Sequence, residues 1–418
     1  MNPTGASTPA QTDTASPDTR QLIKRLLDRG RRPAAAIPTV GRTGPLALSP
    51  GQQRFWLLDQ AWPASTEYLV PTALRLHGPL DQPTLQAALD QVVARHEVLR
   101  TRYMAPAGTP CQVIDPPGPV PLATFDIESA SGEREQTQRE QTQHEQTQHE
   151  QTLHQLMTDV GERPFDLATE WPLRAILIRM SAQEHVLLLV AHHIAVDGIS
   201  MDVLADELAD ACQGLPLPPP SLQYADVAAW QQSWLASPHA ARQLTFWRDA
   251  LAGLTPLALP TDKPRPPRWE PAGDVVTFDV PATDASAVLA EGARRSATSF
   301  MTLLAAFWAV LGRLSGGTDI AVGTPVAGRG RTEFDRVVGL FVNTVVLRGD
   351  LSGGPAFGEL IEQAQRVVAA AHDHQDLPFQ RIVEELRPDR DPSVNPLFQA
   401  MLTYREQNPA PRVAGPLT

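Results

Sequence analysis

The sequence predicts an α/β fold that is divided into two domains. Its 418 residues provide room for two or three hydrophobic cores of ordinary size. Short apolar runs of strand length recur along the chain between amphipathic stretches with helical spacing. A proline-rich linker at 215–220, near the middle of the chain, is the favoured domain boundary.

The expected elements can be placed from the periodicity of apolar residues. In chain order they are a helix at 49–58, a strand at 73–76, a helix from Pro83, a strand at 98–103, strands at 173–180 and 186–191, a helix opened by Ser200, a helix at 300–314, and strands at 319–324 and 341–347. In the strand at 98–103, alternation places Arg100 and Arg102 on the face opposite Leu99.

The first 45 residues are expected to precede the globular sequence as a leader and linker. Residues 1–19 are rich in Ser, Thr, Pro and Ala, which predicts disorder. The stretch 20–29 is amphipathic and predicts a short helix, either a frayed leader or a docking element for a partner helix. Residues 33–44 have the composition of a linker.

Composition excludes several classes of protein. A net charge of −12 argues against a nucleic-acid binder, which needs a basic surface. Only Cys111 and Cys212 are present, so neither a disulfide framework nor a thiolate metal cluster is expected. The chain has no apolar run of transmembrane length and no signal-peptide pattern at its start, so we expect a cytoplasmic protein with no membrane partner.

A five-residue repeat rich in Glu, Gln, Thr and His forms the centre of an expected insertion at 133–156. Its histidines, His144, His149 and His154, suggest a metal site at first sight. Steps of five residues rotate by about 140° on a helix, so these side chains do not share a face. We therefore interpret the repeat as a solvated surface segment and expect no metal site.

The stretch from Ala191 to Ser200 combines the residue types that proton transfer requires. A buried strand leads into His192 and His193, Asp197 and Gly198 form a turn, and Ser200 is a suitable N-cap for the helix that follows. An imidazole titrates near neutral pH and can move protons. The alternative is that adjacent histidines at the end of a strand merely cap a core.

Several stretches, in this order, resemble the signature motifs of the condensation domains of nonribosomal peptide synthetases. They are SPGQQRFWLL at Ser49, RHEVLRTRY at Arg95, HHIAVDG at His192, YADVAAW at Tyr224, VGLFVNT at Val338, HQDLPF at His374 and DPSVNPLFQ at Asp391. The resemblance covers residues 46–410.

The resemblance implies a V-shaped pseudo-dimer of two chloramphenicol acetyltransferase-like subdomains, at 46–214 and 221–418, with the histidine motif at their junction. It implies donor and acceptor carrier domains as partners, each presenting a substrate on 4'-phosphopantetheine, and a neighbouring adenylation domain or synthetase subunit. The acceptor amine would attack the donor thioester, and the domain itself would bind no cofactor.

The motif also assigns catalytic roles. His193 is expected to act as a base or to position the amine, while His192 shares the catalytic motif and is favoured as a structural residue. Asp197 is expected to orient the loop through an arginine, with Arg100 as the first candidate partner and Arg95 as the second.

Further residues are expected around the reacting groups. The backbone N–H of Gly198 would approach the thioester oxygen. Ile199 stands where tryptophan is frequent, near the acceptor side, and Ser200 is expected beside it in the substrate tunnel. Asn343 would line the tunnel from the second subdomain, or alternatively form a hydrogen bond at a strand end.

The energetics of aminolysis indicate what His193 must supply. An α-amine with a pKa of about 8 is roughly 10% neutral at pH 7, so freeing it costs only about 1.4 kcal/mol. A general base gives about 10²–10⁴-fold, whereas aligning two reactants supplies about 7–11 kcal/mol. Positioning should therefore outweigh proton transfer.

Two alternatives to a condensation enzyme remain open. One is an epimerisation domain, although the first and last motifs resemble those of condensation domains. The other is a catalytically silent docking or recruitment module of the same fold. In support of the second, the chain stops at Thr418, where the family continues with further strands, so we expect a truncated second subdomain with an exposed strand at 398–404.

Overall fold

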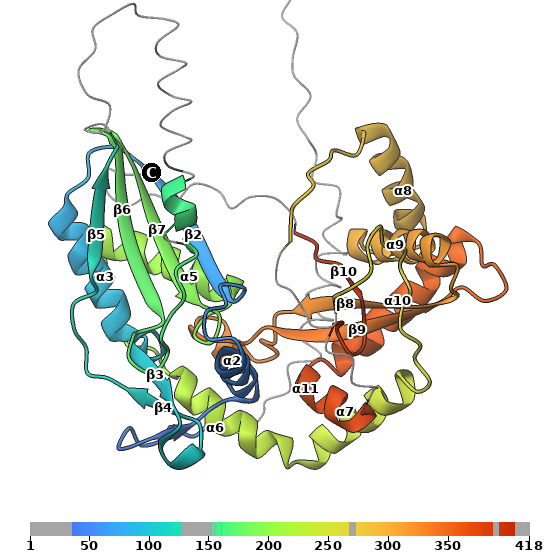
Figure 1. Ribbon diagram of the computed structural model, residues 1–418, viewed down its shortest axis with the longest axis horizontal. Coiled ribbons are helices and arrows are strands. Elements are labelled where there is room, and N and C mark those ends of the chain that lie inside the picture. Colours follow the sequence, from blue (N-terminus) through green and yellow to red (C-terminus); the bar gives the residue numbers. More distant parts are fainter. Residues whose placement is uncertain are drawn as a thin grey trace, which may run out of the picture.

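The computed structural model describes residues 36–127, 153, 155–159, 161–266, 273–387 and 393–405. It has two lobes, each built from a sheet with helices, and the lobes are joined along one side by α6 (Tyr224–Leu235) and α7 (Pro238–Ala250) (Figure 1). Two separate clusters of buried hydrophobic side chains form the two cores.

The first lobe is organised around a four-stranded sheet in the order β2-β7-β6-β5, in which only β5 and β6 run parallel. Its elements are β1 (Leu46–Ala47), α2 (Pro50–Ala61), β2 (Leu69–His77), α3 (Gln82–Arg95), the 3-10 turn η1 (Glu97–Arg100), β3 (Thr101–Met104), the 3-10 turn η2 (Pro106–Gly108), β4 (Cys111–Ile114), β5 (Leu122–Asp126), β6 (Leu173–Ser181), β7 (Glu184–His192) and α5 (Gly198–Cys212). A small sheet β1-β4-β3 lies beside it.

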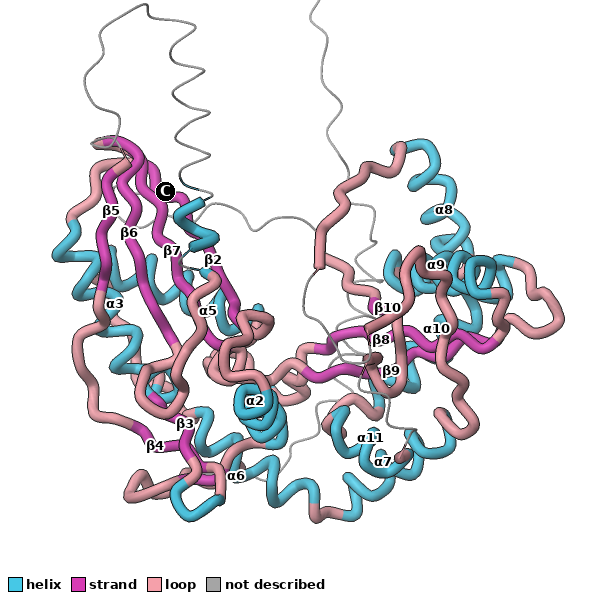
Figure 2. Tube along the Cα trace, viewed as in Figure 1, coloured by secondary structure: helices cyan, strands magenta, loops and turns pink. Residues whose placement is uncertain are grey.

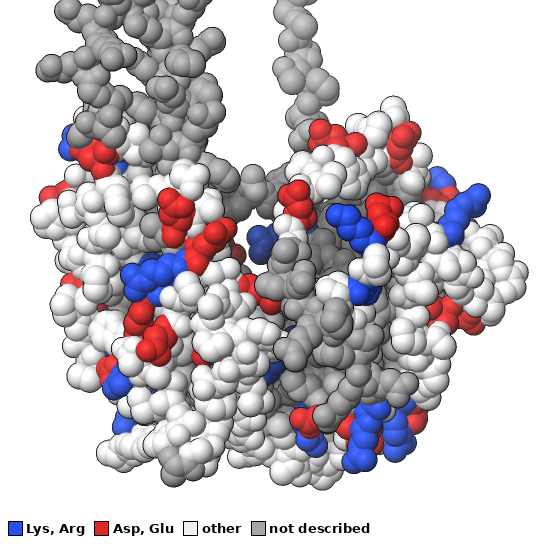
Figure 3. All heavy atoms as spheres, viewed as in Figure 1, with Lys and Arg blue, Asp and Glu red and all other residues white. Residues whose placement is uncertain are grey.

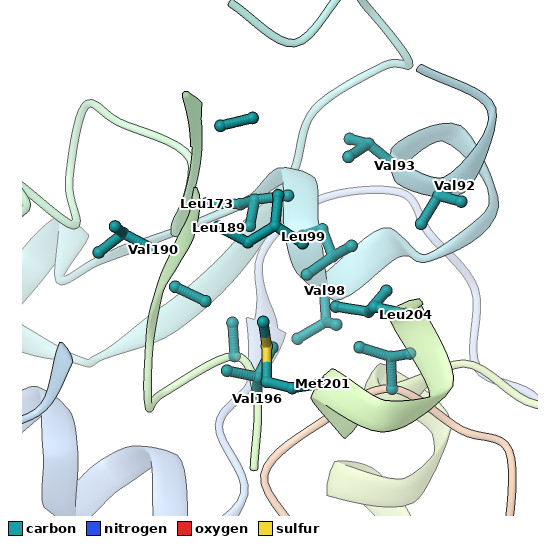
Figure 4. Close-up of a cluster of buried hydrophobic side chains, with 14 of the residues drawn as sticks. Val92, Val93, Val98, Leu99, Leu173, Leu189, Val190, Val196, Met201 and Leu204 are labelled. Atoms are coloured by element: carbon teal, nitrogen blue, oxygen red, sulfur yellow. The ribbon is translucent and has the colours of Figure 1, made fainter. Parts of the chain in front are cut away.

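The core of the first lobe reaches directly beneath the histidine motif. Side chains from α3, η1, β6, β7 and α5 meet in one cluster, and Val196 of the motif points into it (Figure 4). Val196 is fully buried, as are its neighbours Ile194 and Ala195. The loop that follows β7 is therefore held by apolar packing, which fixes the backbone on which the two histidines stand.

The second lobe contains a three-stranded sheet in the order β10-β8-β9. Besides α7, its elements are α8 (Ala282–Arg294), α9 (Ser299–Ser315), β8 (Asp319–Val326), the 3-10 turn η4 (Thr332–Phe334), β9 (Asn343–Asp350), α10 (Phe357–Asp373), α11 (Phe379–Leu386) and β10 (Ala400–Met401). The Thr298 side chain caps α9 by accepting from the N–H of Met301, and Gly316 ends it at a φ of 69°.

The connection between β8 and β9, residues 327–342, leaves the second lobe and packs into the first; we call it the crossover segment. It is the long loop between the two lobes in Figure 2. Five of its apolar side chains, Phe334, Val337, Val338, Leu340 and Phe341, belong to the first core. Tyr224 and Val227 of α6 belong to the same core, so residues on both sides of the expected boundary at 215–220 contribute to it.

Some expected elements differ from those in the structure. The expected strand at 98–103 begins as the 3-10 turn η1, so strand alternation does not apply to Arg100. The helix after the histidine motif begins at Gly198 and its N-cap is Asp197, not Ser200. The carboxylate of Asp197 accepts from the N–H of Ser200 in the first turn, whereas a cap at Ser200 would have placed the start of the helix three residues later.

The leader and the repeat are described only in part. Within the linker expected at 33–44, Ile37 is buried in the first core and the N–H of Val40 donates to Asp226 at 2.8 Å, so this part of the linker contacts the first lobe. The expected insertion at 133–156 includes Leu153, which is buried in the first core. The amphipathic stretch 20–29 and the repeat histidines lie outside the described residues.

Neither a single membrane-spanning helix nor a metal-binding cluster is found within the described ranges. No single helix there is both long and apolar enough to cross a membrane, although α8 and α9 together, bent by 111°, meet the length and composition. No group of three or more His, Cys, Asp or Glu side chains within the same ranges is placed to hold a metal ion. On the face seen in Figure 3, acidic and basic side chains are interspersed over both lobes.

Candidate active site

The two histidines lie at the end of β7, where backbone hydrogen bonds tie the chain to both sides. The N–H of His192 donates to the carbonyl of Pro172 at 3.0 Å, and the N–H of His193 donates to the carbonyl of Tyr68 at 2.8 Å. The turn then closes on itself, since the N–H of Ala195 donates to the carbonyl of His192 at 2.9 Å. These bonds leave the backbone of the loop little freedom.

The ring of His193 is oriented with one nitrogen engaged. Its Nδ1 lies 2.7 Å from the carbonyl oxygen of Val196, which only accepts, so Nδ1 carries the proton in the neutral ring. The lone pair then resides on Nε2. The ring stacks on Phe55 of α2, with centroids 5.2 Å apart and planes 15° from parallel. His193 therefore presents a basic nitrogen from a ring whose direction is fixed.

His192 has a different environment. It is 4% exposed, and burial together with the neighbouring His193 lowers its pKa to about 4. Its Nδ1 accepts a hydrogen bond of 3.1 Å from the N–H of Ile194, and its ring lies edge-on to Phe55 and Phe165. A ring that is neutral at pH 7 and accepts from its own loop shapes that loop, which is the structural role favoured from the sequence.

Asp197 is the centre of a buried polar network between the lobes. The residue is 2% exposed. Its carboxylate accepts from the N–H and the Oγ of Ser200, both at 2.8 Å, and from the N–H of Phe341 at 3.0 Å. Its ion-pair partner is Arg329, whose Nη2 is 3.1 Å from Oδ1. Asp197 therefore joins the start of α5 to both ends of the crossover segment.

The sequence pattern did not reveal Arg329 as the partner of Asp197. The two partners expected for Asp197, Arg100 and Arg95, were wrong. Arg100 instead directs its guanidinium at the carbonyls of Asp115 and Ala94, because η1 turns its side chain away from the motif. Arg95 pairs with Glu207 at 3.0 Å.

The guanidinium of Arg329 is held on several sides. Its Nη1 donates to the carbonyl of Val337 at 2.9 Å and to that of Phe334, and its plane lies 4.1 Å from the ring centroid of Phe341. The side chain is 5% exposed. The signal that was available is the run Gly328-Arg329-Gly330-Arg331, which begins four residues after the end of the strand expected at 319–324.

The first residues of α5 occupy distinct positions. Gly198 lies against the second lobe, since a Cβ placed there would be 3.3 Å from a guanidinium nitrogen of Arg405. Ile199 is 39% exposed. The expectation that Ser200 lines a tunnel was wrong, because it is fully buried, with its Oγ accepting from the N–H of Gly339 at 3.0 Å and lying 2.8 Å from the carbonyl oxygen of the same residue.

Asn343, at the start of β9, uses its whole amide group within the protein. Its Nδ2 donates to the carbonyls of Gln375 at 2.9 Å and Leu377 at 2.7 Å, and its Oδ1 accepts from the N–H of Phe379 at 3.0 Å. The side chain thus fastens the loop at 375–379 to the strand. The geometry corresponds to the hydrogen-bonding alternative rather than to a tunnel-lining amide.

The chain matches one protein family and parts of two large synthases. Residues 43–410 match the family described as "Condensation domain". One of the linear gramicidin synthase proteins of Brevibacillus parabrevis is 41% identical over 377 residues, which are 88% of this chain and 5% of that protein. The isonitrile lipopeptide synthase of Mycobacterium tuberculosis is 38% identical over 87% of this chain and 14% of its own length. The chain therefore spans only a small part of these relatives.

Among solved structures, the X-domain from teicoplanin biosynthesis superposes with a TM-score of 0.76 at 32% identity, covering 88% of this chain and 79% of that one. The complex of the X-domain and OxyB from teicoplanin biosynthesis gives a TM-score of 0.79 at 30% identity, covering 93% and 82%.

Proposed function

Because this chain belongs to the condensation-domain family of nonribosomal peptide synthetases, whose reaction is peptide-bond formation, we propose that it joins two thioester-bound substrates through an amide bond. The observation that supports this proposal most directly is the geometry of His193. Its Nδ1 is anchored on Val196, so its Nε2 is the basic nitrogen, and its ring is clamped against Phe55.

The reaction is an aminolysis that balances without any co-reactant. The amine nitrogen of the acceptor attacks the carbonyl carbon of the donor thioester, and a C–N bond forms. The C–S bond then breaks, the donor's thiol arm leaves, and the proton lost by the amine ends on that thiol. The donor acyl group is thereby transferred to the acceptor carrier.

His193 is proposed to position the amine and to accept its proton at Nε2. Freeing an α-amine costs only about 1.4 kcal/mol at pH 7, so base catalysis, at about 10²–10⁴-fold, has less to supply than alignment. Alignment of the two reactants has about 7–11 kcal/mol to supply, and the fixed ring of His193 serves that purpose.

Gly198 is proposed to stabilise charge on the thioester oxygen. It is the first residue of α5, and the N–H groups of a first helical turn have no partner within the helix and carry partial positive charge. An oxyanion developing near this N–H would be stabilised. Ile199, which is exposed beside it, is proposed to contact the acceptor substrate.

The substrates are proposed to arrive on 4'-phosphopantetheine arms of donor and acceptor carrier domains, with no cofactor resident in this chain. A neighbouring adenylation domain or synthetase subunit is the proposed source of the loaded acceptor. The small share of each relative that this chain covers supports such neighbours, since the remainder of those synthases must hold other units.

The test uses the purified chain with two carrier proteins, one loaded with an acyl or peptidyl thioester and one with an aminoacyl thioester. The proposal predicts that the intact mass of the acceptor carrier rises by the donor acyl group while the donor carrier becomes a free thiol. Carriers that keep their original masses would overturn it. Stable carrier binding without amide formation would instead favour a recruitment module, a role suggested by the likeness to the X-domain seen in complex with OxyB.

A further inference from the structure

A buried relay of side-chain hydrogen bonds connects the histidine loop to the crossover segment by a route separate from Asp197. It begins at Gln52, in the first turn of α2, which is fully buried. The Nε2 of Gln52 donates to the carbonyl of Ile194 at 3.4 Å and to the hydroxyl of Tyr103 at 3.2 Å. Since Ile194 follows His193 directly, the start of α2 holds the loop that carries the proposed catalytic ring.

The relay continues through Ser49, the N-cap of α2. Ser49 and Gln52 form a reciprocal capping box, with bonds of 2.9 and 3.1 Å between each side chain and the other's backbone N–H. The Oγ of Ser49 lies 3.0 Å from the hydroxyl of Tyr224. That hydroxyl gives its one proton to the carbonyl of Leu340, so Ser49 is the donor in the bond between them.

Tyr224 meets the crossover segment at three consecutive residues. Its ring lies against Gly339, where a Cβ would come within 1.9 Å of the ring, and it packs edge-on to Phe341 with centroids 5.3 Å apart. Its hydroxyl bonds to Leu340 between them. The ring supplies apolar packing, whereas the hydroxyl adds a directed hydrogen bond at Leu340, between the bonds that Ser200 makes to Gly339 and Asp197 makes to Phe341.

We propose that Tyr224 is a positioning residue for the condensation reaction, acting through Ser49 and Gln52 to fix the crossover segment relative to the histidine loop. The inference rests on the proposed function. The crossover segment belongs in sequence to the second lobe, so the relay aligns groups contributed by the two halves. An error of about 1 Å in such alignment costs up to about 10²-fold in rate.

The test compares two hydroxyl deletions of equal size, Tyr224→Phe and Tyr103→Phe. Both tyrosines are fully buried and both have pKa values raised by burial, so the two variants remove the same group from similar surroundings. The hydroxyl of Tyr103 bonds to Gln52 and, within the described residues, to no part of the crossover segment. For Tyr224→Phe we expect kcat to fall by about 10- to 100-fold, with the KM for each loaded carrier within about threefold of the parent value. For Tyr103→Phe we expect kcat to stay within about threefold of the parent value.

The thermal midpoints of the two variants should be alike, which separates positioning from loss of fold. Ser49→Ala interrupts the same relay one bond earlier and should give the same loss of kcat. The double variant that combines Ser49→Ala with Tyr224→Phe should lose no more kcat than either single variant. A kcat for Tyr224→Phe equal to that of Tyr103→Phe would overturn the inference while leaving amide formation intact. An inactive parent protein would overturn the proposed function itself.

Discussion

Replacing Asp197 by asparagine is expected to destabilise the protein far more than its small change in shape suggests. The carboxylate accepts from Ser200, Phe341 and Arg329 in a site that water does not reach. The substitution leaves the guanidinium of Arg329, 5% exposed, without its counter-charge. Removing one partner of a buried ion pair costs about 3–5 kcal/mol, because the other charge stays buried.

The hydrogen bonds of the carboxylate add to this cost. Ser200 donates to Oδ1 and Phe341 to Oδ2, so the NH₂ group of an asparagine must face a donor whichever way the amide turns. One donor is then left unsatisfied, at about 1–3 kcal/mol, in addition to the lost charge.

Urea denaturation measures the effect through the midpoint of unfolding. The control is Arg248→Ala, which removes a pair whose side chains are 53% and 65% exposed and which is worth about 0–1 kcal/mol. We expect a clear drop in midpoint for Asp197→Asn and almost none for the control. If Asp197→Asn unfolds at the midpoint of the parent, the ion pair does not join the two halves as argued.

Three further predictions follow from the site and its surroundings. The pKa of His192 is about 4 in the folded protein and 6.5 in an unfolded chain. The free energy of unfolding should therefore fall by about 3 kcal/mol in all as the pH drops from about 6.5 to about 4. His192→Gln should lose this pH-dependent component, and the same pH dependence in parent and variant would contradict the prediction. Gly339→Ala should lower the thermal midpoint by the equivalent of about 1–3 kcal/mol, since its Cβ would enter the ring of Tyr224, and an unchanged midpoint would show that the segment yields freely. Asn343→Ala removes the hydrogen bonds that hold the loop at 375–379, which should lower the stability of that loop by about 1–3 kcal/mol and expose it to limited proteolysis under native conditions. A digestion pattern like that of the parent would show that the loop is held without this amide.

Local patterns in the sequence predicted local structure well. The continuous apolar run at 186–191 became the buried strand β7, and the helix expected at 300–314 is α9. Both depend on periodicity within one short segment, which the sequence displays directly. The histidine loop could be placed at a strand end for the same reason.

Contacts between distant segments could not be read in this way. Arg329 lies 132 residues after Asp197, and nothing in the spacing of either residue indicates the other. Arg100 was chosen because strand alternation put it on a plausible face, and the 3-10 turn at that point removed the premise. Ser200 was assigned to the tunnel beside Ile199, but the crossover segment, 139 residues further along the chain, buries it in the fold.

The role proposed for His193 is measured by the initial rate of amide formation by the parent protein and by His193→Ala, with the same loaded carriers and a reaction without protein as baseline. Substitution should not disturb the fold, because the loop keeps its backbone bonds to Tyr68 and Pro172. We expect a rate lowered by about 10²–10⁴-fold that still exceeds the baseline, since much of the alignment of the two reactants survives. A rate within threefold of the parent would remove His193 from the mechanism and contradict the central claim.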